Sequence, residues 1–263
     1  MKDFLKQKRN LAALCVWGAL VLALIGGLIL DIVLYNKGSI EKADFNHRLL
    51  FVFLCFIMMT LVFVIELAFG IRLPLFLELS CCIFAFVGLA GGTVYGLYGV
   101  MPAYDKFLHT TSGLLFSAVG LTLSDILLKN QPVGARRAVA AVAIAFFFSL
   151  AVGYLWEIFE FSVDSIIPTM NNQRWQWNDY PIDMGDGTFL VGDKRGTALI
   201  DTLGDMIVNL IGTVVFLVPM LVLFLKKPNS LSLFHITVWR KKCNKQQPEE
   251  SVPEEKADGF DLE

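Results

Sequence analysis

The sequence predicts an all-α polytopic membrane protein with six transmembrane helices. Hydrophobic residues make up 56% of the 263 residues and charged residues only 17%. The mean hydropathy is +0.61, and the chain contains apolar blocks of about 20 residues or more, the length that crosses a bilayer. The net charge of −2, without a basic stripe interleaved with aromatic residues, argues against a nucleic-acid partner.

The predicted spans follow one another in chain order. A basic start, from Lys2 to Arg9, precedes an apolar run that reaches about Tyr35. That run is too long for the apolar part of a cleaved signal peptide, so it is interpreted as an uncleaved first helix. The other five helices are expected at about residues 49–69, 73–97, 104–128, 138–163 and 199–225.

The third predicted helix carries three glycines at four-residue spacing, Gly88, Gly92 and Gly96. This spacing places them on one face of a helix. Small residues let two helix backbones approach closely in a membrane. We therefore expect a neighbouring helix to pack against this face.

Lysine and arginine positions predict the orientation. With the N-terminus inside, the inner segments hold fifteen of the 22 lysines and arginines and the outer segments hold seven. Positive residues are enriched in cytoplasmic segments, which favours an N-in/C-in topology. We expect three regions: two helices in 1–70, a four-helix core with a polar site in 71–226 that includes a long outer loop at 164–198, and a partly disordered cytoplasmic tail in 227–263.

Three of the predicted helices carry acidic, histidine or amide side chains inside otherwise apolar runs. These are Asp105 and His109 in the fourth helix, Glu157 and Glu160 in the fifth, and Asp201, Asp205 and Asn209 in the sixth. Within each helix the three- or four-residue spacing puts them on one face. An ionised group in hydrocarbon costs roughly 2.5–3.5 kcal/mol on insertion scales and normally faces the protein interior. All seven fall near the outer ends of their helices, so we expect one shared site.

Such a site would combine up to five carboxylates, one imidazole and one carboxamide. This set suits a divalent metal such as magnesium, manganese or iron, and zinc is also compatible. All seven residues are candidate metal ligands, and His109, Glu157 and Glu160 are also candidate catalytic acids or bases. Two alternatives stay open: a structural polar network that only packs the helices, and a transport site that binds a coupling ion.

The position of the predicted site indicates the partners. Membrane lipids surround it, and we expect an amphiphilic substrate with its polar head beside the acids and its tail in lipid. An anionic head would need the metal or a basic residue such as Lys106 to offset the carboxylates. In the outer loop, Trp175, Trp177 and Tyr180 are expected either to rest at headgroup level or to form a lid.

The polar motifs also resemble known families. The segments 104–113, 156–161 and 201–212 look like the uncharacterised bacterial YjdF-like inner-membrane family. They are similar, more distantly, to VanZ-like proteins, whose pattern has Asp-Lys-x-x-His, a helical Glu and Asp-x-x-x-Asn-x-x-Gly. The resemblance covers about residues 85–225, and Arg195 stands farther from the last helix motif than the VanZ-like arginine does. It implies a multi-pass protein of the inner (cytoplasmic) cell membrane, with envelope physiology on the VanZ-like side, and no specific reaction.

Overall fold

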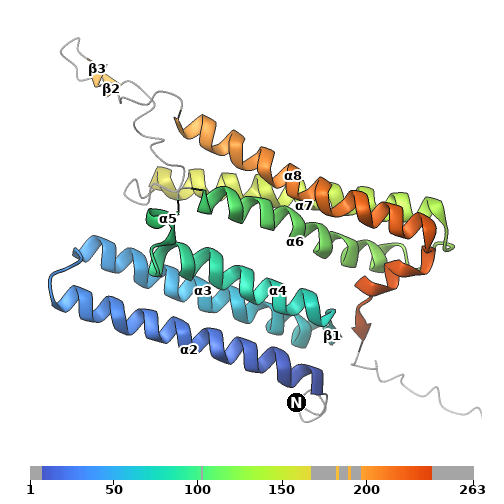
Figure 1. Ribbon diagram of the computed structural model, residues 1–263, viewed down its shortest axis with the longest axis horizontal. Coiled ribbons are helices and arrows are strands. Elements are labelled where there is room, and N and C mark those ends of the chain that lie inside the picture. The colour runs from blue at the N-terminus through green and yellow to red at the C-terminus, as the bar shows by residue number, and fades with distance from the viewer. Residues whose placement is uncertain (1–7, 102, 167–181, 184–188, 191–196, 239–263) are drawn as a thin grey trace, which may run out of the picture.

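Six long helices make up most of the protein (Figure 1). The structure is a computed structural model that describes residues 8–101, 103–166, 182–183, 189–190 and 197–238. Each of the six helices is long and apolar enough to cross a membrane. The predicted fold class, an all-α polytopic membrane protein, is confirmed. The N-in/C-in orientation stays a prediction.

The elements follow the predicted spans closely. In chain order the helices are α2 (Lys8–Asn36), α3 (Lys42–Phe69), α4 (Leu75–Ala85), the π-helical η1 (Phe86–Val94), α5 (Leu97–Val100), α6 (Tyr104–Leu127), α7 (Ala135–Ile166), α8 (Thr197–Lys226) and the 3-10 helix η3 (Pro228–Phe234). Two short antiparallel strand pairs join β1 (Ile71–Arg72) to β4 (Thr237–Val238) and β2 (Ile182–Asp183) to β3 (Phe189–Leu190). The largest shift is at α3, which begins seven residues before the predicted start.

The third span combines two helix types. Regular α-helix gives way after Ala85 to a π-helix, and the backbone N–H of Tyr95 bonds to the carbonyl of Ala90, five residues earlier. Gly96 then turns the chain with a φ of 71°, a left-handed conformation that glycine adopts without steric cost. This turn leads through α5 into α6, so that the next span starts beside the one it follows.

The helices form two sets that lie side by side along α4 and α6 (Figure 1). In the first set, α2, α3 and the third span bury a cluster that includes Met59 and Ala90. In the second set, α6, α7 and α8 bury a cluster that includes Leu121 and Phe224, and Leu77 of α4 joins it. Helix α4 therefore packs with both sets. The expected division of the chain at residue 70 stays a prediction.

The backbones of α6 and α8 approach each other closely, although the glycines of α6 do not recur at four-residue spacing. A Cβ added to Gly113 would meet the backbone carbonyl of Asn209 on α8, and one added to Gly212 would meet the carbonyl of Thr110. The expected approach at Gly88 is wrong, because a Cβ there would have no neighbour within 4 Å. Gly92 faces Tyr98 of the same segment, and Gly96 serves the turn. Glycine therefore holds α6 against α8.

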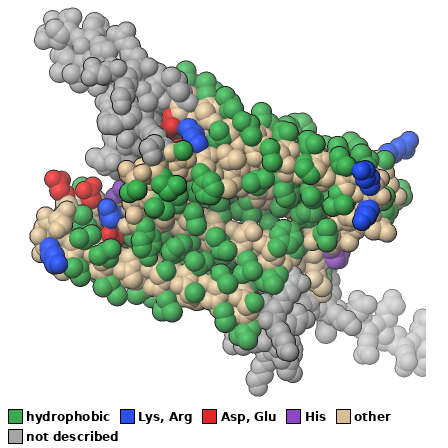
Figure 2. All heavy atoms as spheres, viewed as in Figure 1, with side chains coloured by type: hydrophobic (Ala, Val, Ile, Leu, Met, Phe, Trp, Pro, Cys, Tyr) green, Lys and Arg blue, Asp and Glu red, His purple; other side chains and the backbone are tan. Residues whose placement is uncertain are grey.

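The surface matches a membrane-spanning bundle. On the face drawn in Figure 2, hydrophobic side chains cover the length of the helices and charged side chains gather at the two ends. The start of α2 and the end of α8 lie at the same end (Figure 1). The start of α6, with Asp105, lies at the opposite end, where the three polar motifs were expected to meet.

Part of the expected tail is folded. Leu231, Phe234 and Ile236 are buried, and β4 pairs with β1, so the chain after α8 folds back against the helix ends. Residues 239–263 lie outside the described residues, as do most of the outer loop and its Trp175, Trp177 and Tyr180.

Candidate functional site

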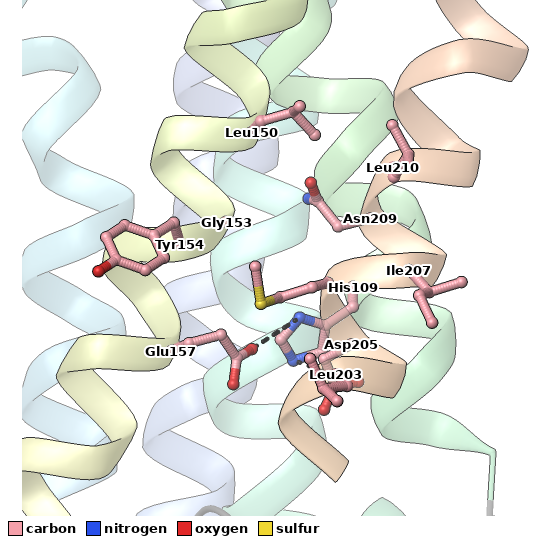
Figure 3. Close-up of a pocket in the computed structure, with 11 residues that line it drawn as sticks. His109, Leu150, Gly153, Tyr154, Glu157, Leu203, Asp205, Ile207, Asn209 and Leu210 are labelled. Carbon is pink, nitrogen blue, oxygen red and sulfur yellow. Dashed lines mark ion pairs between the residues drawn. The ribbon is translucent and has the colours of Figure 1, made fainter. Parts of the chain in front are cut away.

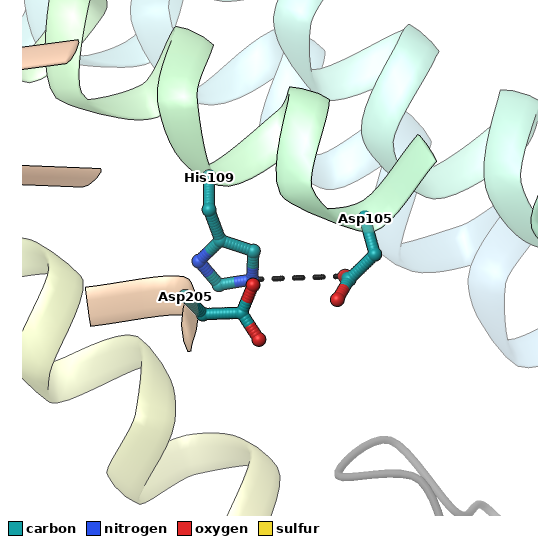
Figure 4. A group of neighbouring side chains, drawn as sticks. All are labelled: Asp105, His109 and Asp205. Atoms are coloured by element: carbon teal, nitrogen blue, oxygen red, sulfur yellow. Dashed lines mark ion pairs between the residues drawn. The ribbon is translucent and has the colours of Figure 1, made fainter. Parts of the chain in front are cut away.

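His109 is the central side chain of a buried polar cluster. It follows Asp105 by one turn of α6, and both side chains face the protein interior. Its Nε2 lies 3.7 Å from Asp105 Oδ1 and 3.7 Å from Asp205 Oδ1 on α8. Figure 4 shows the imidazole between the two carboxylates. One nitrogen of the ring therefore faces carboxylates from two helices.

The other nitrogen faces α7. His109 Nδ1 lies 3.6 Å from Glu157 Oε1, and Glu157 is buried. Glu160 follows one turn later on α7 and accepts a 2.9 Å hydrogen bond from the indole N–H of Trp156. Both glutamates have a carboxylate oxygen within 4.8 Å of a ring nitrogen of His109. The predicted convergence of α6 and α7 is therefore present in the structure.

The stripe on α8 completes the cluster. Asp201, Asp205 and Asn209 are all buried, and their four-residue spacing puts them on the α8 face that packs on α6. Asn209 Nδ2 donates to Ser112 Oγ at 2.9 Å, and the Ser112 hydroxyl donates to the carbonyl of His109 at 2.7 Å. All seven predicted residues thus lie in one polar region, although their roles as ligands or catalysts remain predictions.

Lys106, expected only as a basic residue that could offset the carboxylates, lies inside the cluster itself. Its Nζ lies 2.8 Å from Asp201 Oδ1, 2.8 Å from Asp205 Oδ1 and 3.5 Å from Asp105 Oδ2, and it also donates to the carbonyl of Asp201. The signal that could have found it is the lysine's own position in a transmembrane run, because a buried lysine needs carboxylate partners. The structure places this cation among the three aspartates.

A pocket opens beside the cluster, between α7 and α8 (Figure 3). Its volume is about 300 Å³, at the lower end of the roughly 300–1,000 Å³ typical of ligand sites. The residues with polar side chains that line it are His109, Tyr154, Glu157, Asp205 and Asn209, and the apolar lining includes Leu150, Leu203, Met206, Ile207 and Leu210. Leu203 and Ile207 are 48% and 56% exposed, so the rim of the pocket lies on the apolar outer surface of the helix bundle.

The comparisons with known proteins identify the family. The family described as "Predicted membrane protein (DUF2238)" matches residues 19–226. The chain belongs to this family. DUF2238 is the YjdF-like family, so that resemblance is confirmed, whereas the VanZ-like resemblance is not. No curated protein and no solved structure matches the chain significantly.

The DUF2238 match covers more of the chain than the resemblance suggested. It begins at residue 19, within α2, and so includes the first two spans, which the motif-based resemblance left out. It ends at residue 226, the last residue of α8. The matched region therefore contains the polar cluster, the pocket and both sets of helices, and the family description itself supports membrane residence.

Two overlapping groups in this DUF2238 chain could hold a metal ion. Asp105, His109 and Asp205 form one, and His109, Glu157 and Glu160 form the other, with ligand atoms within 4.8 Å of one another in each. Oxygen ligands with a single nitrogen suit magnesium, manganese or iron. Lys106 already supplies positive charge on the aspartate side. Both groups reach the pocket, the first through Asp205 and the second through Glu157.

Proposed function

We propose that this protein is an intramembrane enzyme of the inner (cytoplasmic) cell membrane that acts on a lipid or a lipid-linked envelope substrate. The observation that carries the proposal is the pocket between α7 and α8, which joins lipid-facing apolar side chains to His109, Glu157 and Asp205. An amphiphile could enter from the bilayer with its reactive group beside the cluster.

The cluster supplies the chemistry for such a reaction. A divalent ion held by His109, Glu157 and Glu160 would polarise a carbonyl or phosphoryl oxygen or activate water. His109 or one of the two glutamates would then move the proton, because all lie within one short network. The charge balance supports a cation here, since five carboxylates share the site with one lysine.

A transport function fits the geometry less well. The polar groups deeper than Asn209 are mainly hydroxyls, and those of Thr122 and Ser124 donate to carbonyls of their own helix. Asp125, near the far end of α6, is occupied by an ion pair with Arg137 at 2.9 Å. Among the described residues the cluster opens sideways to lipid, which supports an enzyme over a transmembrane path.

Metal content and lipid composition test the proposal. Purified full-length protein should contain a divalent metal at about one ion per chain, and Glu157→Gln and Glu160→Gln should lose it. Glu41→Gln is the matched control, because Glu41 is an exposed carboxylate outside the pocket. In cells that lack the chain, a lipid or envelope precursor should accumulate, and the wild type and Glu41→Gln should restore it to normal.

The same experiments separate the alternatives. If His109→Ala and Glu157→Gln restore the lipid profile as well as the wild type does, the enzyme proposal is wrong. If purified, folded wild-type protein contains no divalent metal, the proposed metal site is wrong. If His109→Ala and Glu157→Gln lose stability and nothing else, the cluster acts only to hold α6, α7 and α8 together.

A further inference from the structure

The polar lining of the pocket consists mainly of hydrogen-bond acceptors. Glu157 and Asp205 present carboxylates, and Asn209 presents a carboxamide. Of the described residues that line the pocket, none is lysine or arginine. A ligand head in this pocket therefore meets negative charge and acceptor oxygens beside the His109 ring and Tyr154.

Asn209 is held so that its oxygen faces the pocket. The side chain is 2% exposed, and Nδ2 is engaged by Ser112 Oγ at 2.9 Å. The carboxamide lies against α7, where a Cβ added to Gly153 would be 2.9 Å from Oδ1 and 3.2 Å from Nδ2 (Figure 3). Among the described residues no donor reaches Oδ1. The lone pairs of this oxygen can therefore accept a hydrogen bond from a ligand in the pocket.

The nearest cation is already engaged by aspartates. The ammonium group of Lys106 is bound by Asp201 and Asp205, both at 2.8 Å, and Lys106 is not among the described residues that line the pocket. A phosphate or carboxylate head that entered the pocket would lose its hydration shell, and the carboxylates of the lining would repel it. Where no metal ion lies between the head and the carboxylates, the charge distribution therefore opposes an anionic head directly against this lining.

The apolar part of the pocket fixes where the tail lies. Leu150 and Leu210 lie beyond Asn209 from the carboxylates (Figure 3), so an amphiphile would keep its head at Glu157 and Asp205 and its chain along these leucines. Asn209 then sits at the junction of head and tail. A hydroxyl or amine on the first carbons of a bound amphiphile would lie at this position, next to Asn209.

We infer that the pocket binds an amphiphile whose head donates hydrogen bonds and carries no negative charge, with one donor bonded to Asn209 Oδ1. A glycerol monoester and a long-chain amine both have this chemistry. The inference rests on the proposed function, because it names the substrate class of the same pocket.

Binding of matched probes tests the inference. Full-length protein in phosphatidylcholine nanodiscs would be titrated with a monoacylglycerol, an alkylamine and a fatty-acid anion of equal chain length. We expect the first two to bind at least tenfold more tightly than the anion, and the ratio between them to show whether a hydroxyl or an amine is preferred. Equal or tighter binding of the anion, with or without bound metal, would overturn the inference.

Two variants link the preference to Asn209. Asn209→Leu removes the acceptor and should weaken monoacylglycerol binding about tenfold, the effect of roughly one hydrogen bond. Gly153→Ala crowds the Asn209 carboxamide from α7, so it decides the matter if Asn209→Leu does not fold. Gly26→Ala is the matched control, because a Cβ there would have no neighbour within 4 Å. Unchanged binding in Gly153→Ala and in any folded Asn209→Leu would overturn the inference.

The outcome also distinguishes this inference from the proposed function. If the probes show the expected preference but no metal or lipid change is found, only the proposed enzyme activity fails. If metal and lipid changes are found but the anion binds best, only the substrate class is wrong.

Discussion

At the scale of single residues, Lys106 and His109 organise the acids around them. A charged lysine inside a membrane is costly unless carboxylates surround it, and Lys106 contacts three of them on two helices. His109 is shared in the same way, with one ring nitrogen toward Asp105 and Asp205 and the other toward Glu157. Each residue therefore joins helices as well as serving the site.

The lysine can be tested by a charge-balanced pair of substitutions. Lys106→Met leaves Asp201 and Asp205 buried without their cation, at an expected cost of about 1–3 kcal/mol, less than the roughly 3–5 kcal/mol of a fully buried pair. The expected cost is lower than for a fully buried pair because the lysine side chain is 33% exposed and water screens its charge. Thermal unfolding in detergent should show Lys106→Met unfolding below the wild type, and the double variant with Asp205→Asn recovering part of the loss.

The double variant is the control for this prediction. Removing the carboxylate together with the cation leaves less unpaired charge, so the two changes should be less than additive. If Lys106→Met unfolds at the wild-type temperature, the ion pairs with Asp201 and Asp205 do not contribute to stability. If the two changes are simply additive, the two residues do not interact energetically.

At the scale of elements, the contact between α6 and α8 depends on glycine. Gly113 and Gly212 let each helix meet a backbone carbonyl of the other, and this close approach brings Asn209 within hydrogen-bonding distance of Ser112. Helices in lipid gain little from apolar burial against one another, so packing of small residues and polar contacts determine which helices pair. The site therefore depends on these two glycines, which lie outside it.

Two glycine substitutions provide the test at this scale. Gly113→Ala places a methyl group against the backbone of Asn209, which cannot rotate away, and overpacking of this kind costs about 1–3 kcal/mol. Gly88→Ala should leave stability unchanged or raise it slightly, because its Cβ would have no neighbour within 4 Å. Unfolding midpoints in detergent should therefore separate the two variants. Equal midpoints would show that the α6–α8 approach is loose.

At the scale of the whole molecule, the polar groups at the two ends of the second helix set differ. The cluster at the start of α6 adjoins the pocket, whereas the far end is closed by ion pairs. There Asp125 contacts Arg137 at 2.9 Å and His235 at 2.7 Å, and η3 covers the core with Leu231 and Phe234. The folded part of the tail thus closes one end of the bundle and leaves the other to the site.

Cysteine labelling tests which end faces outward. In a background without the native cysteines, Asn171→Cys should react with a membrane-impermeant reagent in intact cells, and Ser251→Cys should react only after permeabilisation. Lys37→Cys, in the connection between α2 and α3, is a control expected on the same side as Asn171. If positions 171 and 251 label from the same side, the N-in/C-in topology with six spans is wrong.

The sequence by itself determined the six spans and the faces that carry the polar residues. A bilayer requires about 20 apolar residues per helix, and three- or four-residue spacing places Asp105 with His109 and Glu157 with Glu160 whatever the helices contact. Only the tertiary structure decided that Lys106 lies among the aspartates, that Gly113 and Gly212 rather than Gly88 bring helices together, and that a pocket opens between α7 and α8. The physical reason is that lipid is as apolar as the helices, so hydropathy predicts which segments enter the membrane but not which of them pair.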